Sequence, residues 1–291
     1  MAFGSVKEIL EKCTKDNIEF WQAVIHDDIT ERGSTEEESF EKMRTMWEAM
    51  VSSADDYEPD IKSNSSLVGG MGGKFEKYSE KGESYCGDFV GEVIKYALEM
   101  GENNACMKRI VAAPTAGACG VMPAVLIPIF KRNMADEEKI IKALFTASGI
   151  GQVIAERAFI AGASGGCQAE IGSASAMAAA ALTFIKGGSN EEITFASAMA
   201  LQNLLGLVCD PVAGLVEVPC VKRNVIGAMN ALSCADMALA GIGNIIPLDE
   251  VIDAMREVGE SMNVNLKETG CGGCANTPTG IRIKKELMGE E

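Results

Sequence analysis

Histidine is almost absent from this 291-residue chain, which contains a single one, His26. Aromatic residues make up only 5% of the sequence, and the apolar positions are filled mainly by Ala, Leu, Ile, Val and 16 methionines. Such residues suit helix packing better than the faces of a β-sandwich. No period-two strand pattern and no fixed repeat is visible. We therefore expect a single all-α domain over residues 1–291, long enough to bury a sizeable core.

Positive charge is also scarce. Against 42 acidic residues stand 26 basic ones, which leaves a net charge of −16 and no basic stripe, so nucleic acid is not an expected partner. The first residues, MAFGSVKEIL, lack a basic stretch followed by an apolar run, so a cytoplasmic location is expected. Residues 110–130 carry no charge, but three prolines interrupt them. We expect a buried loop and a core helix there, and no membrane partner.

Three regions follow one another along the chain. Residues 1–50 predict two amphipathic helices, the second opened by a capping box of Ser34 and Glu37. Residues 51–87 are polar and rich in Gly and Ser, and predict a long loop or linker. Residues 88–291 predict a helical core and a Gly-rich tail, with Ala-rich helices in the centre. The helices expected there span 136–159, 172–186, 189–205, 221–240 and 248–262.

Ten cysteines need an explanation in a reducing compartment, where disulfides are disfavoured. Cys167 precedes a predicted helix, and Cys209 and Cys220 flank a Pro/Gly loop, so their thiolates could point inward near helix N-termini. Nearby amide groups also stabilise the sulfurs of an anionic cluster. The remaining helical cysteines are expected to be packing residues, namely Cys13, Cys106 and Cys234.

Spacing alone does not identify a metal. The three loop cysteines are 42 and 11 residues apart, which matches no short iron-sulfur or zinc pattern. Cys271 and Cys274 form a CxxC around two glycines, without a second such pair. For this pair, redox chemistry or cluster capping is better supported than zinc binding.

Four longer motifs carry a clearer signal: APTAGACGVMPAVL, GCQAEIGSASAMAAAAL, LVCDPVAGLVEVPCVKRN and LKETGCGGCANTPTG. Together they resemble the α portion of the iron-sulfur L-serine dehydratases over nearly the whole chain. The resemblance implies an all-α catalytic domain that binds a 4Fe-4S cluster at helix ends and loops, through Cys167, Cys209 and Cys220. One iron would stay open as a Lewis acid, and L-serine would be converted to pyruvate and ammonia without pyridoxal phosphate.

The resemblance also implies a substrate site. The segment SNSSLVGGMGG resembles a Ser/Gly-rich loop near the cluster, and its hydroxyls and glycine amides could approach an anion. Ser65 and Ser66 are the first candidates for hydrogen bonds to the substrate carboxylate. The other candidate substrate contacts are Ser63, Gly69, Gly70, Thr115 and Asn224.

The sequence departs from the family in two places. The family's histidine motifs lie in a β portion missing from this chain, so the general base is either His26 or a group on a separate β subunit, which we favour. Lys222, Arg223 or Lys267 would contribute charge.

The second departure is Cys271 and Cys274, which stand in a motif that usually lacks such a pair. They would cap the fourth iron until serine displaces them, or act as oxidisable thiols. An open iron also predicts sensitivity to oxygen.

Three other interpretations remain open. A lyase that eliminates sulfide from L-cysteine would use the same scaffold. A non-catalytic iron-sulfur protein, an electron carrier or sensor, would need four protein ligands. A purely structural helical module would bury its cysteines without metal.

Overall fold

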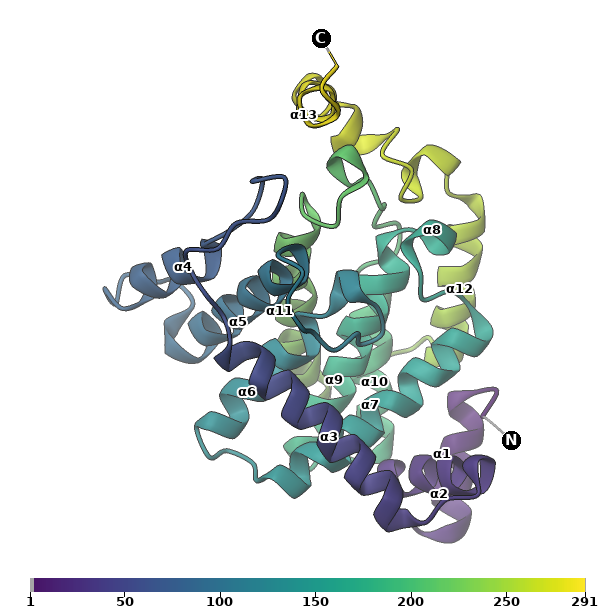
Figure 1. Ribbon diagram of the computed structural model, residues 1–291. Helices are drawn as coiled ribbons and strands as arrows, with labels where there is room; N and C mark the ends of the chain where they lie inside the picture. Colours follow the sequence, from purple (N-terminus) through teal and green to yellow (C-terminus); the bar gives the residue numbers. More distant parts are fainter. Residues whose placement is uncertain (1–2, 291) are drawn as a thin grey trace.

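The computed structural model describes residues 3–290, and these form helices and no β-strand (Figure 1). The expected all-α class is therefore confirmed. The α-helices are α1 (Val6–Asp16), α2 (Phe20–Arg32), α3 (Glu36–Asp55), α4 (Met71–Ser79), α5 (Gly87–Ala105), α6 (Val121–Lys131), α7 (Glu137–Arg157), α8 (Gly162–Gly165), α9 (Ser173–Ile185), α10 (Asn190–Gln202), α11 (Cys220–Leu239), α12 (Leu248–Ser261) and α13 (Pro278–Met288). The shorter turns are η1 (Ala116–Ala118), η2 (Gln168–Gly172), η3 (Val212–Gly214), η4 (Val264–Leu266) and η5 (Gly273–Asn276).

Helix α9 is the centre of the fold. It contacts α6, α7, α10 and α11, and its residues 173–184 are all buried. Its sequence, SASAMAAAALTFI, is uncharged and mostly small, so four neighbouring helices can approach its backbone closely. The expectation that Ala-rich helices occupy the centre is confirmed. Helix α9 continues directly from the π-helical turn η2, which starts one residue after Cys167.

The N-terminal region differs from its prediction. Residues 3–55 form three helices, α1 to α3, rather than two. The capping box of α3 uses Thr35 and Glu38, not Ser34 and Glu37: Thr35 has the extended backbone that an N-cap needs, and its hydroxyl accepts from the Glu38 amide at 3.2 Å. Both alternatives have the same Ser/Thr-x-x-Glu spacing, and the backbone conformation decides between them.

The predicted long loop over 51–87 is only partly confirmed: residues 56–70 and 80–86 lie outside helices, and the rest is helical. Helix α3 runs on to Asp55, and Met71–Ser79 form helix α4. Helix α4 begins after Gly70, and the amides of its first two residues donate to the buried carboxylate of Glu102 on α5, at 2.7 and 3.1 Å. A carboxylate from a distant part of the chain thus supplies the N-terminal interaction that the local sequence lacks.

The later helices follow their predictions closely. Those expected at 136–159, 172–186, 221–240 and 248–262 are found within a few residues, and the helix expected to reach 205 ends at Gln202. The capping box of Ser189 and Glu192 is present. Residues 110–130 form a loop followed by the buried helix α6, as expected. Over residues 3–290, no helix combines the length and the apolarity needed to cross a membrane.

The packing cysteines can be checked individually. Cys13 and Cys234 lie in the hydrophobic core, which confirms their predicted role. Cys106 is instead half-exposed at the end of α5.

One buried carboxylate under α4 carries an energetic cost. Glu99 on α5 is 5% exposed, and a side chain added at Gly72 of α4 would come within 2.5 Å of its Cγ. Burial raises the pKa of Glu99 to about 7, although the charge of Lys95 opposes the shift. Glu99 therefore holds a proton in the folded state at pH values where it is ionised in the unfolded chain.

This linkage predicts a pH-dependent effect of Glu99→Gln. The wild-type protein should lose stability as pH rises from about 4.5 to about 7, because only the unfolded state releases the Glu99 proton there. The variant should be about 2–3 kcal/mol more stable than wild type at pH 8 and nearly equal to it at pH 4.5. Urea unfolding at both pH values tests this. Glu92→Gln, at an exposed ion pair with Arg132, is the control, and a gain for Glu99→Gln that does not depend on pH contradicts the assignment.

Candidate active site

The three cysteines predicted as ligands come together in the folded chain. Cys167 precedes the η2 turn, Cys209 lies in the loop after α10, and Cys220 is the first residue of α11. Their exposed fractions are 3%, 2% and 7%. Cys167 and Cys209 lie close enough for each to shift the pKa of the other, and Cys220 interacts electrostatically with both. The packing of α11 against α9 brings these separate segments together.

An arginine balances negative charge at these thiols. The guanidinium of Arg223 binds Asp210 Oδ1 and the carbonyl of Val208, each at 2.7 Å. The neighbouring Cys209 thiol and the charge of Arg223 lower the pKa of Cys167 although burial opposes this, whereas burial raises the pKa of Cys220 to about 12. The pKa of Cys209 is raised, because Cys167 lies beside it and because it is buried. The environment thus favours one thiolate, on Cys167.

The donor set fits an iron-sulfur cluster. Thiolates are the usual protein ligands of such clusters, and three of them from three segments can each bind a different iron. A side chain at Gly162 would come within 2.8 Å of Cys209 Sγ and of Glu170 Oε2, so glycine keeps the space beside that thiol free. Within residues 3–290, no three His, Cys, Asp or Glu side chains surround a point that could hold a single metal ion.

Glu170 lies next to the cysteines and was not identified from the sequence. It belongs to the η2 turn, and the hydroxyl of Thr115 donates to its Oε1 at 2.6 Å. Burial raises the pKa of Glu170, the bond from Thr115 lowers it, and the charge of Glu268 raises it further. Its signal in the sequence is one acidic residue in the otherwise uncharged segment GCQAEIGSASAMAAAAL. Turns of π-helix often occur at functional sites.

Asn224 connects the segment around Thr115 to the cysteines. Its Nδ2 donates to the carbonyls of Gly117 and Cys220, at 3.0 and 3.2 Å, and its Oδ1 accepts from the amide of Gly120 at 2.8 Å. The side chain is 1% exposed. Its polar atoms are thus bound to backbone groups that position both segments, and its contact with substrate stays a prediction.

The Ser/Gly-rich loop reaches the same region through Glu217. The hydroxyls of Ser63 and Ser65 donate to Glu217 Oε2, at 2.7 and 2.5 Å. Glu217 is 7% exposed and lies between Cys209 and Cys220 in the sequence. The sequence placed this loop near the cysteines by resemblance, but Glu217, which makes the connection, was missed.

The other candidate residues of this loop, Ser66, Gly69 and Gly70, differ in whether their polar groups are free. Ser66 is exposed, and its hydroxyl makes no hydrogen bond with residues 3–290. Gly69 and Gly70 both have positive φ and lie against the backbone of residues 59–62. The amides that follow them bind Glu102, so a protein carboxylate already fills the anion site expected at these glycines.

The remaining candidate residues are dispersed. His26 is exposed on α2, which lies at the opposite end of the molecule from η3 and α13 (Figure 1). Lys222 is exposed on α11. Lys267 lies beside Cys209 through an isolated backbone bridge.

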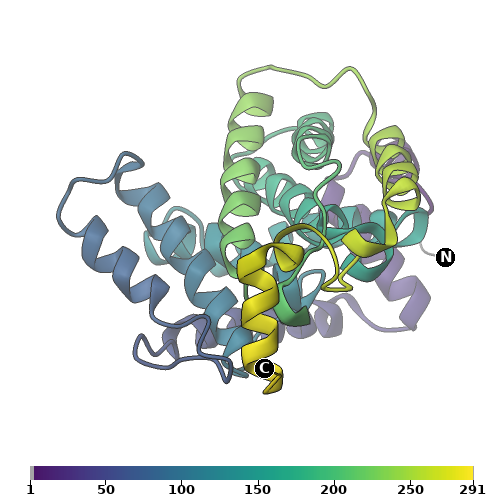
Figure 2. The ribbon, with the colours of Figure 1, turned by 90° about the horizontal axis from the view of Figure 1, so that it is seen from above.

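The CxxC of the tail lies near the cysteine loop. Cys271 and Cys274 are exposed, but the amide of Cys274 donates to Asp210 Oδ2 at 2.6 Å, and Asp210 follows Cys209. The view from above shows the C-terminal segment and α13 crossing this end of the molecule (Figure 2), where α13 contacts η3. The tail thus packs beside the loop that connects Cys209 to Cys220.

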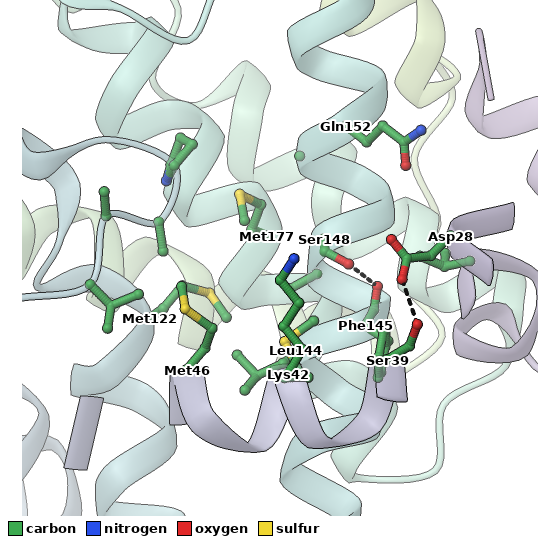
Figure 3. A pocket seen from close by; sticks show the side chains of 18 of the residues that line it. Asp28, Ser39, Lys42, Met46, Met122, Leu144, Phe145, Ser148, Gln152 and Met177 are labelled. Atoms are coloured by element: carbon green, nitrogen blue, oxygen red, sulfur yellow. Dashed lines mark hydrogen bonds between the residues drawn. The ribbon is translucent and has the colours of Figure 1, made fainter. Parts of the chain in front are cut away.

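A separate cavity lies elsewhere in the molecule. It measures about 760 Å³ and opens between α2, α3, α7 and residues 111–114 (Figure 3). Methionines such as Met46, Met122 and Met177 line it, and Lys42 points into it. No cysteine lines this cavity, so it is not the place where the thiols would act.

Comparison with known proteins gives a consistent result. A family model described as "Serine dehydratase alpha chain" matches residues 9–275. A Bacillus subtilis (strain 168) protein named "Probable L-serine dehydratase, alpha chain" is 44% identical over 99% of this chain and 96% of its own length. The "L-serine dehydratase, alpha chain" of Peptoniphilus asaccharolyticus is 42% identical over 99% of both chains. The "L-serine dehydratase TdcG" of Escherichia coli (strain K12) is 34% identical over 94% of this chain but only 61% of its own length.

The ion pair beneath the cysteines yields a stability prediction. The side chains of Arg223 and Asp210 are only 11% and 3% exposed, so Asp210→Ala would leave a nearly buried guanidinium without its counter-charge. We expect the free energy of unfolding, measured with urea under anaerobic conditions, to fall by about 3 kcal/mol. The exposed pair of Asp253 and Arg157 is the matched control, and Asp253→Ala should cost less than about 1 kcal/mol. Equal losses would mean that the burial of the first pair has no energetic effect.

Proposed function

This chain belongs to the family of serine dehydratase alpha chains, and from that membership we propose that it is an L-serine ammonia-lyase, which converts L-serine to pyruvate and ammonia. One observation carries the proposal beyond the family: three buried thiols, from segments 42 and 11 residues apart, meet beside a single arginine. Packing alone would not require a cation there, because buried thiols behave as small apolar groups.

We propose that Cys167, Cys209 and Cys220 hold a 4Fe-4S cluster. Bound there, the cluster would supply a Lewis acid at an iron without a protein ligand. No pyridoxal phosphate is required. The proposal is supported by the thiol donor set, by Arg223, which offsets negative charge, and by Gly162, which leaves room beside Cys209. Cys271 and Cys274 remain the candidates for a cap on the fourth iron, since the tail packs beside Asp210.

The substrate carboxylate is assigned to the Ser/Gly-rich loop. Ser66 is the strongest candidate, because its hydroxyl is exposed and unpaired. The hydroxyls of Ser63 and Ser65 are held by Glu217, and that of Thr115 by Glu170, so a substrate would have to compete for them. Gly69 and Gly70 shape the turn rather than offer free amides. The loop therefore positions the substrate mainly through its exposed serine.

We assign the general base to a second chain. The only histidine, His26, is exposed on a helix at the far end of the molecule. Relatives are named alpha chains, and the longer Escherichia coli relative has a region that this chain does not match. A β subunit that adds a proton acceptor at the cysteine face would complete the site. Lys267, beside Cys209, is better placed than Lys222 to add positive charge.

Two cysteines of α11 test the cluster proposal. Cys220→Ala should lose iron, sulfide and at least 90% of activity after anaerobic purification, because one of three ligands is removed. Cys234→Ala, at a fully buried core position on the same helix, is the matched control and should retain all three. If the Cys220 variant keeps full iron content and full turnover, the ligand assignment is wrong. Wild-type protein without iron would favour a structural module instead.

A second test separates the competing reactions. Purified chain is assayed anaerobically for pyruvate and sulfide, with L-serine or L-cysteine, in the presence and absence of the β chain. We expect pyruvate from serine only with both chains, and at least tenfold slower turnover of cysteine. Preferred sulfide release would identify a cysteine lyase. If the protein turns over neither substrate and serine does not change the spectrum of its cluster, the protein is an electron carrier or sensor. Air exposure of the active protein should abolish turnover.

A further inference from the structure

Glu170 has fewer partners than the buried carboxylates of Glu102, Asp210 and Glu217. Glu102 accepts hydrogen bonds from Tyr57, Met71 and Gly72. Asp210 binds Arg223 and an amide, and Glu217 accepts from two serine hydroxyls. Glu170 has one hydrogen bond, from Thr115, and forms no ion pair with any residue from 3 to 290. A partly buried carboxylate is normally paired, because an unpaired charge is costly away from water.

The unpaired oxygen of Glu170 points to the thiols. Thr115 occupies Oε1, whereas Oε2 lies within 2.8 Å of the position that a side chain at Gly162 would take. The same position is 2.8 Å from Cys209 Sγ. On its other side, Gly117 approaches the carboxylate so closely that an added side chain would be 3.0 Å from Oε1. Two glycines thus leave space at the carboxylate, and a free acceptor faces the thiol group.

Among residues 3–290, no cation forms an ion pair with Glu170 that would occupy this acceptor. Arg223, the cation beside the thiols, has its guanidinium engaged by Asp210 and by the carbonyl of Val208. The charged side chain that acts on Glu170 is another carboxylate, Glu268, which raises its pKa. A cationic group from outside the chain would satisfy Glu170. An amino acid brings one such group, its α-ammonium, together with the carboxylate assigned to the Ser/Gly-rich loop.

We propose that Glu170 binds the α-ammonium group of the substrate and that Thr115 positions the Glu170 carboxylate for it. The proposal rests on the proposed function and adds to it a basis for choosing amino acids over hydroxy acids. A charge-assisted hydrogen bond to an ammonium fixes the orientation of the substrate at the thiols. A 2-hydroxy acid of the same shape would offer Glu170 a neutral hydroxyl donor and leave its negative charge without a counter-charge, so the site should bind such an analogue more weakly.

The test compares serine with glycerate, which has a hydroxyl in place of the ammonium. Anaerobic holoenzyme with its β chain is assayed for the KM of L-serine and for the Ki of glycerate as a competitive inhibitor. In Glu170→Gln, we expect the KM of serine to rise about 10- to 100-fold and the Ki of glycerate to change less than about threefold. Glu268→Gln is the matched control, and its KM for serine should stay within about twofold of wild type.

A general disturbance of the site would give a different pattern. If the KM of serine and the Ki of glycerate rise by the same factor, or if Glu268→Gln has the same effect as Glu170→Gln, the ammonium assignment is wrong. Iron content is measured for each variant. If Glu170→Gln does not retain iron, Thr115→Val is the second test, because it leaves the carboxylate in place. It should raise the KM of serine by a smaller factor than expected for Glu170→Gln and leave the Ki of glycerate unchanged. If the wild type is active and the variants have the same KM for serine, only this inference is overturned. If the wild type is inactive and free of iron, the proposed function itself is overturned.

Discussion

The burial of three thiols against one guanidinium is the constraint on which the rest of the site depends. Arg223 stays beside Cys167 because Asp210 and the carbonyl of Val208 hold it, and Asp210 also binds the amide of Cys274. The Arg223–Asp210 ion pair therefore connects the cysteine loop, the start of α11 and the C-terminal tail. Such an arrangement keeps negative sulfurs tolerable in a nearly water-free place.

Small side chains make this burial feasible. The alanines of α9 let α11 pack against it, and this contact brings the segments of Cys167 and Cys220 together. Small residues have the same effect at Gly162 and Gly117, whose backbones lie close to Cys209 and Glu170. In both the core and the site, small side chains let backbones approach closely and leave space for larger or reactive side chains.

Several acidic side chains are buried and form hydrogen bonds between distant segments of the chain. Glu102 starts helix α4, and Glu217 joins the Ser/Gly-rich loop to the cysteine loop. Both replace partners that the local sequence does not provide. Glu170 has the same type of side chain but keeps an unused acceptor, so its surroundings, rather than its residue type, set it apart as a binding group.

The sequence by itself determined the helical class, the boundaries of α7, α9, α11 and α12, and the capping box of Ser189, because each depends on local composition or local caps. Long motifs also predicted the three loop cysteines as ligands, and that assignment stays a prediction. The sequence did not determine helix α4, the choice of Thr35 over Ser34, or the roles of Glu102, Glu170 and Glu217. Only the tertiary structure decided these. The partners of the three carboxylates are 30 to 154 residues away in the chain, and a carboxylate that binds across such a distance leaves no local pattern. The two alternative caps have the same spacing, and only the backbone conformation separates them. Periodicity reports which face of a helix is buried, but not which distant group it meets.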